Sequence, residues 1–243
     1  MAYRRAKNLD KNLIFAEYFN SDQEVRRNGG VPTDVTFDKG VAEFNGSSSI
    51  IRTNSSAGDG LLKASVRVKF KITTLTDYDA IFVRRGSEFI GMYLLGSSVY
   101  FWTAGGKNIG RAPVGEWLDV VYTYNSDDSK WYGYINGVSA ESGFAAANGF
   151  GSDADWQIGY DNGARYFDGD IELIEIYNKA LTAEEVKNLY NDARYKVPVL
   201  EHDFQGGTDV ASGWNTVGFW DTVQTGWTLS DGVWSCNGTN GFL

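Results

Sequence analysis

Three acidic side chains, Asp170, Glu172 and Glu175, lie in one short segment that is otherwise aliphatic. Hydrolysis of a glycosidic bond with retention of configuration uses two carboxyl groups about 5 to 5.5 Å apart, one as nucleophile and one as acid and base. Acids on one strand are candidates for this chemistry. The alternative is a structural strand with a polar face, which we favour because no complete catalytic set accompanies these acids.

Aromatic residues near predicted turns are a second resource. Trp102, Trp131, Tyr160 and Tyr166 offer flat apolar faces on which sugar rings can stack. Tryptophan and tyrosine also fill the cores of β-sandwiches, so packing is the competing role for each of them. We expect glycan binding, if present, to use these four residues.

Two residue types limit the remaining chemistry. His202 is the only histidine and Cys236 the only cysteine. A histidine-based triad, a multi-histidine zinc site and an intrachain disulfide are therefore not expected. We expect His202 to be a surface or packing residue, and we expect no obligatory cofactor.

These side chains must be positioned by β-strands. Residues 63–72 alternate strictly between apolar and polar types, which predicts a strand with one buried and one wet face. Further strands are predicted at residues 79–83, 89–95, 98–103 and 117–124, with a glycine-rich separator at 104–115. Asn136-Gly137 predicts a two-residue hairpin turn. No βαβ pattern is present, so the sheets are expected to be antiparallel.

The acidic segment runs directly into a predicted helix. Thr182 and Glu185 have the spacing of a capping box, and Leu181 and Val186 that of a hydrophobic staple. In the strand before it, strict alternation would place Ile171, Leu173 and Glu175 on one face, and Glu172, Ile174 and Ile176 on the other. The sequence therefore predicts a buried strand followed by one short docked helix.

This region resembles the closing signature of laminin-G-like, concanavalin-A-like jelly-roll domains. The matching residues are Phe167, Gly169, Ile171, Ile174, Ile176, Tyr177, Asn178, Ala180, Leu181, Thr182, Glu184 and Glu185. Residues 116–124, 132–138 and 156–159 also resemble strands of that family, in the same order. The resemblance implies an all-β antiparallel sandwich over residues 13–197, with one short C-terminal helix. It does not imply one function, because this fold is shared by lectins, glucanases and adhesion modules.

The family suggests two sites to test. Laminarinase-type glucanases carry two catalytic glutamates and an aspartate on one strand, which Asp170, Glu172 and Glu175 resemble with the first two acid types exchanged. Pentraxins place calcium ligands in a loop that corresponds to residues 159–164. Asp161, Asn162 and Glu88 are the candidate calcium ligands here. Calcium needs six to eight oxygens, so we favour an Asx turn in a surface loop.

Charge and hydropathy exclude other partners. The formal net charge is −9, which disfavours nucleic acid, and no apolar run approaches the roughly 20 residues that a membrane helix needs. Residues 1–12 form a basic leader with Arg4, Arg5, Lys7 and Lys11. We interpret it as solvated rather than as an arm that docks on an acidic partner.

Residues 198–243 form a β-rich extension that resembles the beginning of the chain. Residues 229–239 align without gaps on residues 37–47. The extension is too short to bury a sandwich core of its own. It also contains Trp214, Trp220, Trp227 and Trp234. We interpret it as a partial second repeat that mediates assembly with further copies of the chain or with another structural protein.

These features together favour a non-enzymatic protein of a virion surface, decorating a head or tail and attaching to cell-surface glycans. The motive is an adhesion-type fold without an apolar signal segment or a disulfide, made in the host cytoplasm. The alternatives are a glycan-cleaving enzyme of the laminarinase type and a secreted, extracellular bacterial adhesion module.

Overall fold

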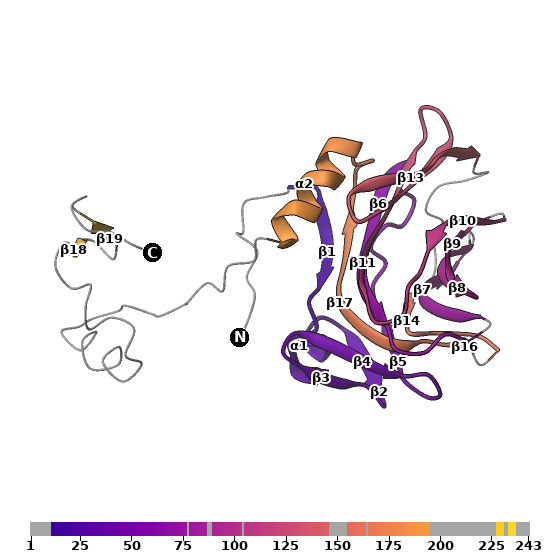
Figure 1. The fold of residues 1–243 in the computed structure, drawn as a ribbon, viewed down its shortest axis with the longest axis horizontal. Helices are drawn as coiled ribbons and strands as arrows, with labels where there is room; N and C mark the ends of the chain where they lie inside the picture. Colours follow the sequence, from indigo (N-terminus) through magenta and orange to yellow (C-terminus); the bar gives the residue numbers. More distant parts are fainter. Residues whose placement is uncertain are drawn as a thin grey trace. The chain divides into compact units, whose positions relative to one another are not determined.

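A computed structural model describes residues 11–76, 78–86, 89–103, 105–145, 155–163 and 165–194, together with strands at 227–230 and 233–236. The chain divides into two compact units, Met1–Pro198 and Val199–Leu243. The first unit contains two antiparallel sheets that face each other (Figure 1). This arrangement confirms the predicted all-β sandwich. No described helix has the length and apolar character needed to cross a membrane.

The first sheet has eight strands. In spatial order they are β13 (Val138–Ala145), β12 (Lys130–Ile135), β11 (Trp117–Asn125), β6 (Lys63–Ile72), β17 (Asp168–Tyr177), β4 (Val41–Asn45) and β3 (Thr36–Asp38), and β1 (Leu13–Glu17) also pairs with β17. The two-residue turn predicted at Asn136-Gly137 joins β12 to β13, with φ of 51° and 76°. Positive φ at both positions is the geometry of a type I′ hairpin turn, as the sequence predicted.

The second sheet has seven strands. In spatial order they are β10 (Gly106–Arg111), β9 (Ser98–Trp102), β8 (Phe89–Leu95), β7 (Asp79–Arg85), β14 (Trp156–Ile158), β5 (Ile50–Thr53) and β2 (Gly30–Thr33). A short hairpin of β15 (Tyr160–Asp161) and β16 (Arg165–Tyr166) follows β14 and contacts β7. Strand β10 falls inside the glycine-rich segment that the sequence analysis treated only as a separator.

The core lies between the two sheets. Every apolar residue predicted to face inward from β6 is buried there: Ala64, Val66, Val68, Phe70 and Ile72. Phe82 stacks on Trp156 with ring centroids 4.2 Å apart, and Phe101 stacks on Tyr122 at 3.8 Å. The first pair lies within the seven-stranded sheet, whereas the second joins β9 of that sheet to β11 of the other and so packs the two layers together.

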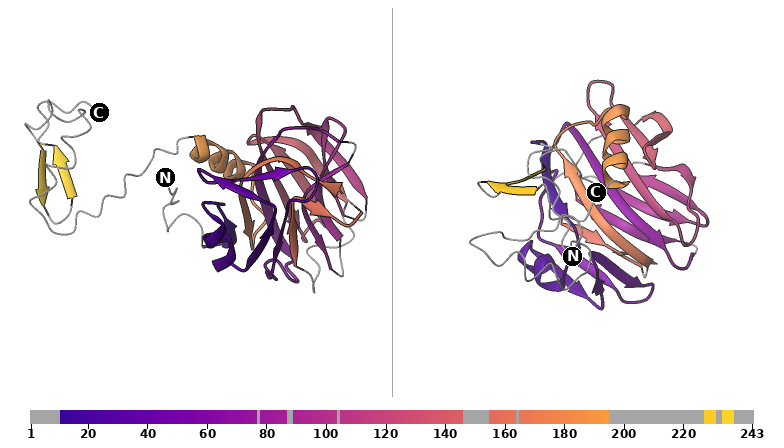
Figure 2. Two further views of the ribbon diagram at one scale, coloured as in Figure 1. Left: turned by 90° about the horizontal axis from the view of Figure 1, so that it is seen from below. Right: turned by 60° about the vertical axis from the view of Figure 1, so that its left-hand side comes forward.

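Two helices accompany the sheets. Helix α1 (Asp22–Arg27) was not predicted, and its N-cap is Ser21. Helix α2 (Ala183–Arg194) is the predicted one, and it lies against the eight-stranded sheet (Figures 1 and 2). Its capping box is formed: the Thr182 amide donates to Glu185 at 2.9 Å, and the Glu185 amide donates to the Thr182 hydroxyl at 3.2 Å.

The docking of α2 corrects the prediction that β6 has one wet face. Ser65 and Arg67 point away from the core, yet both are buried. The Ser65 hydroxyl donates to the Lys179 carbonyl and accepts from the Leu181 amide, at 2.8 and 3.0 Å. The outer face of β6 around Ser65 and Arg67 is therefore covered by a segment more than 100 residues away in the sequence, whereas Lys63 and Lys71 on the same face stay partly exposed.

The second unit contains one described hairpin, β18 (Trp227–Ser230) with β19 (Val233–Cys236). Leu229 pairs with Trp234 in this hairpin, as Phe37 pairs with Ala42 in the hairpin of β3 and β4. Residues that are aligned in the proposed repeat, 229 with 37 and 234 with 42, therefore take the same positions in the two hairpins. The interpretation of residues 198–243 as an assembly element stays a prediction.

Candidate functional site

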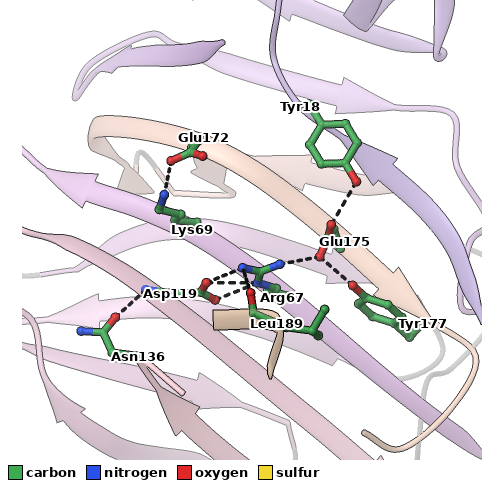
Figure 3. Close-up of polar contacts among 9 residues, drawn as sticks. All are labelled: Tyr18, Arg67, Lys69, Asp119, Asn136, Glu172, Glu175, Tyr177 and Leu189. Atoms are coloured by element: carbon green, nitrogen blue, oxygen red, sulfur yellow. Dashed lines mark hydrogen bonds and ion pairs between the residues drawn. The ribbon is translucent and has the colours of Figure 1, made fainter. Parts of the chain in front are cut away.

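The three acids of the candidate catalytic set form a ladder of ion pairs with β6. Asp170 pairs with Lys71 at 2.7 Å, Glu172 pairs with Lys69, and Glu175 pairs with Arg67 at 2.9 Å (Figure 3 shows the last two). All three lie on the outer side of the eight-stranded sheet, which α2 partly covers. Each of the three carboxylates therefore forms an ion pair with a different basic residue of β6.

Glu175 belongs to a buried network centred on Arg67 (Figure 3). The Arg67 guanidinium donates to Asp119 Oδ1 from Nε at 2.9 Å, and to the Leu189 carbonyl of α2 from Nη2 at 3.2 Å. Tyr18 and Tyr177 donate their hydroxyl protons to Glu175 at 3.0 and 2.7 Å. Burial lowers the pKa of Arg67, but the two carboxylates outweigh it, so the pKa is raised and the charge is kept. This network ties β11, β17, α2 and the residue after β1, Tyr18, to β6.

A second cluster lies on the outer side of the seven-stranded sheet. We call it the aromatic face, and it consists of Tyr78, Phe89, Tyr93, Tyr100 and Trp102 packed over Ala80 and Val83. Tyr93 is buried, whereas the other four rings are half-buried. In Figure 1, no helix of the described chain lies over strands β7 to β10. Four of the five rings are therefore partly accessible to solvent in the described part of the chain.

The rings of the aromatic face contact one another at angles. Tyr78 lies 5.1 Å from Tyr93 and 6.2 Å from Trp102, measured between ring centroids. Trp102 pairs across the sheet with Gly91 on one side and Gly106 on the other. A Cβ at Gly106 would come within 2.5 Å of the Trp102 ring, so the indole lies close against the backbone there. Glycine at this position lets the tryptophan lie flat on the sheet.

Asp161 anchors charged groups beside the aromatic face. Its carboxylate is fully buried and accepts from Arg85 at 2.6 and 2.7 Å, from Arg165 at 3.0 Å and from the Tyr93 hydroxyl at 2.8 Å. Burial raises the pKa of Asp161, but the hydrogen bonds from Arg85 and Tyr93 outweigh burial and lower it overall. The pKa of the Tyr93 hydroxyl is raised, first by burial and then by its bond to Asp161. Asp161 is thus held as an anion.

The two arginines reach from this anion to the rings. The Arg85 guanidinium lies 4.7 Å from the centroid of Phe89, and that of Arg165 lies 4.3 Å from the centroid of Tyr78. Their side chains are 40% and 38% exposed. Both distances are within the range of a cation–π contact, which fixes the planes of the guanidinium groups.

The glycan-binding candidates from the sequence fall into three places. Trp102 lies on the aromatic face. Tyr160 and Tyr166 form a half-buried pair, 4.8 Å between centroids, on the neighbouring hairpin. Trp131 is 0% exposed and lies 4.6 Å from Phe101 in the core, so its expected role is corrected to core packing. An aromatic residue on a strand of a sandwich packs in the core if it points to the inner side of its sheet, and can meet a ligand if it points to the outer side.

Calcium does not fit the position of Asp161. Both of its oxygens accept hydrogen bonds from guanidinium groups, which would also repel a dication. Asn162 is exposed, and Glu88 lies outside the described residues. Within the described ranges, no group of three or more histidine, cysteine or acidic side chains could hold a metal. Two arginines therefore stand where the pentraxin-like loop was expected to hold a cation.

The remaining assignments concern the second unit. Trp214 and Trp220 lie outside the described residues, as does His202. Trp227 and Trp234 are in β18 and β19, but their side chains are not among those described. The site residues that were not predicted from the sequence are Tyr78, Phe89, Tyr93, Tyr100, Arg85 and Arg165. The alternation Phe89-x-Gly91-x-Tyr93 beside Tyr100-x-Trp102 was the available signal.

Comparison with known proteins places this geometry in a family. The model described as the concanavalin A-like lectin/glucanases superfamily matches residues 45–187. No curated protein matches the chain.

Several solved structures share the fold. Domain 4 of AbnA, a GH43 extracellular arabinanase from Geobacillus stearothermophilus, in complex with arabinotriose, has a TM-score of 0.61 and 19% identity, covering 74% of this chain and 98% of that domain. Trypanosoma rangeli sialidase has a TM-score of 0.63 and 13% identity, covering 78% of this chain but 34% of the sialidase. The SAP-like pentraxin of Limulus polyphemus has a TM-score of 0.52 and 15% identity, covering 62% of this chain and 81% of the pentraxin. At these identities the likeness concerns the fold alone.

Proposed function

Because the chain belongs to the concanavalin A-like lectin/glucanases superfamily, we propose that it is a non-enzymatic glycan-binding protein. The ligand lies on the aromatic face of the seven-stranded sheet. The observation that carries this proposal is the set of half-buried rings of Tyr78, Phe89, Tyr100 and Trp102 on a sheet that α2 leaves uncovered.

The chemistry of sugars fits this surface. A pyranose ring has an apolar face of C–H groups, which packs on a flat aromatic ring, while its hydroxyl groups need polar partners at the edge. The aromatic face provides the rings, and Arg85 and Arg165 provide donors beside them. The arabinotriose complex of the arabinanase domain shows that a domain of this fold can be solved with a bound sugar, which supports the proposal by analogy.

Trp102→Ala tests the proposal against a matched control. Trp117 is also half-buried, but it lies on the other sheet beside Lys69 and Lys71, so Trp117→Ala removes an equivalent ring away from the aromatic face. On a glycan array followed by calorimetric titration, we expect Trp102→Ala to weaken binding about tenfold or more, roughly 1.4 kcal/mol. Trp117→Ala should leave it unchanged. Equal binding by both variants would refute this location of the site.

The alternative function is cleavage of a glycan by Asp170, Glu172 and Glu175. The ion pairs of these acids with Lys71, Lys69 and Arg67 favour a structural role. A screen of β-glucans and other polysaccharides for released reducing ends would test it. Turnover that is lost in Glu172→Gln would replace the proposed function with the enzymatic one.

We further propose, from the sequence, that the protein acts on a virion surface, with other virion proteins or further copies of itself as partners. The secreted bacterial adhesion module is the competing assignment. Mass spectrometry of density-purified particles from a lysate distinguishes the two, because a virion protein bands with capsid proteins. Recovery only from the culture medium without particles would support the adhesion module.

A further inference from the structure

We propose that the glycan carries a carboxylate, as uronic and sialic acids do, and that Arg85 and Arg165 bind it at the edge of the aromatic face. This inference rests on the proposed function and specifies the ligand of the same site.

Positive charge is concentrated on the outer side of the seven-stranded sheet. Direct cross-strand pairing places Arg52 in one row with Gln157, Val83, Gly91 and Trp102, on the side of the aromatic face. Arg85 lies two residues after Val83, and Arg111 pairs with Ser98, two residues before Tyr100. Among the described strand residues of this side, including the β15–β16 hairpin, the one acid is the buried Asp161. The chain as a whole has a net charge of −9, so this side differs in sign from the average surface.

The arginines are already oriented and keep donors for a second partner. Arg85 uses Nε and Nη2 on Asp161, whereas Arg165 uses only Nη1. A guanidinium has five N–H donors, so within the described structure each arginine retains donors beyond those given to Asp161. Two cations share one anion, which leaves one positive charge in excess. A carboxylate is the planar anion that such a fork binds with two parallel hydrogen bonds.

The rings and arginines are close enough to serve one sugar unit. Arg85 lies over Phe89 and Arg165 over Tyr78, and Tyr78 contacts Trp102. Because guanidinium groups lie over Phe89 and Tyr78, the pyranose stacks on the neighbouring Trp102, and its exocyclic carboxylate extends toward the guanidinium over Tyr78. Asp161 is a positioning residue in this arrangement, because it fixes both guanidinium groups from below without reaching the ligand.

The test compares carboxylated glycans with their carboxyl-reduced counterparts. The probes are polygalacturonate, alginate, hyaluronan and 3′-sialyllactose, each paired with the form in which the carboxylate has been reduced to an alcohol. Binding is measured by calorimetry or biolayer interferometry on the full chain at 150 mM salt. We expect at least one carboxylated probe to bind about tenfold or more tightly than its reduced form.

Single substitutions assign the preference to residues. We expect Arg165→Gln and Arg85→Gln each to remove most of the preference while weaker binding of the reduced form persists. Arg27 of α1 is exposed, so Arg27→Gln is a control with the same change of charge and type. Arg165→Gln keeps both bonds from Arg85 to Asp161, so it serves if Arg85→Gln fails to fold.

Each remaining outcome overturns the inference in a recognisable way. Equal affinity for both forms, with Trp102→Ala still weakening it, leaves the proposed function intact and refutes the carboxylate. Absence of binding to every carboxylated probe also refutes it. If dextran sulfate or a single-stranded oligonucleotide binds as tightly and with the same dependence on Arg165, the surface recognises polyanions in general rather than a carboxylated sugar. Loss of all glycan binding refutes the proposed function itself.

Discussion

Replacing Glu175 by Gln is expected to destabilise the protein far more than the same change at Glu172. Glu175 is fully buried, and its carboxylate accepts from Arg67, Tyr18 and Tyr177. Glutamine is nearly isosteric but neutral, and its amide group would face the guanidinium as a donor. Glu172 forms an ion pair with Lys69, and both side chains are 19% exposed.

The magnitude follows from burial and from the number of partners that remain. Removing one partner of a buried pair costs about 3 to 5 kcal/mol. Arg67 keeps three hydrogen bonds to the Asp119 carboxylate, so we expect the lower end, about 3 kcal/mol. A domain of this size loses about 2 to 4 °C of Tm per kcal/mol, which gives roughly 6 to 12 °C for Glu175→Gln. A partly exposed pair is worth up to about 1 kcal/mol, hence a loss of at most about 4 °C for Glu172→Gln.

Differential scanning calorimetry and urea unfolding followed by circular dichroism measure both variants. Asp170→Asn is a second exposed-pair control, because Asp170 and Lys71 are also only partly buried. We expect Glu175→Gln to lower Tm most, and Glu172→Gln and Asp170→Asn to lower it by similar, smaller amounts. Equal Tm values for all three variants would refute the account of a buried network beneath α2.

Four further outcomes are expected. Gly159→Ala should cost about 3 kcal/mol or more in urea unfolding, because φ is +76° and a Cβ would lie 2.1 Å from the ring of Phe44; a loss under 1 kcal/mol would contradict this. Burial raises the pKa of Glu17 above the usual value of 4.5. The buried carboxylate therefore costs stability once the pH rises above that value, and Glu17→Gln should raise Tm at pH 7 but not below pH 4. A gain in Tm that is the same at both pH values would show that charge is not the cause. Calorimetric titration with calcium should give the same result for wild type and Asp161→Asn, since arginines occupy the carboxylate; calcium binding that requires Asp161 would reverse that conclusion. Deleting residues 198–243 should leave a soluble, cooperatively melting monomer that no longer assembles, as judged by calorimetry and light scattering; failure to fold would place the segment in the first unit.

The sequence was sufficient wherever short-range physics decides the structure. Strict alternation predicted residues 63–72 with the bounds of β6, since polar and apolar types mark the two sides of a strand. Asn136-Gly137 predicted its hairpin because both residues tolerate positive φ. Thr182 and Glu185 predicted the start of α2 from a spacing of three residues.

The aromatic face could not be predicted because its members meet across strands. Gly106 belongs to a glycine-rich stretch that looks like a loop, yet it pairs with Trp102 in a strand, and its missing side chain makes room for the indole. Trp131 and Trp102 have similar local surroundings in the sequence, near turns and among aromatic residues. Only the pairing of their strands in the sheets decides that Trp131 faces the core and Trp102 the outer side.

A β-bulge explains why three acids that resemble a catalytic set act as structural partners. Ile171 pairs with Phe70 and Leu173 with Lys69, so Glu172 is an extra residue in β17. Strict alternation from Ile171 would have put Glu175 on the inner face, in the core.

The extra residue reverses the sides for the rest of the strand. Ile174 and Ile176 join Ile171 in the core, and Glu175 pairs with Arg67 on the side that α2 covers. The acid that would have been an unpaired buried charge becomes the anchor of the network to which α2 is bound. The spacing of the acids in the sequence therefore reflects the bulge, which places one carboxylate on the side that α2 covers.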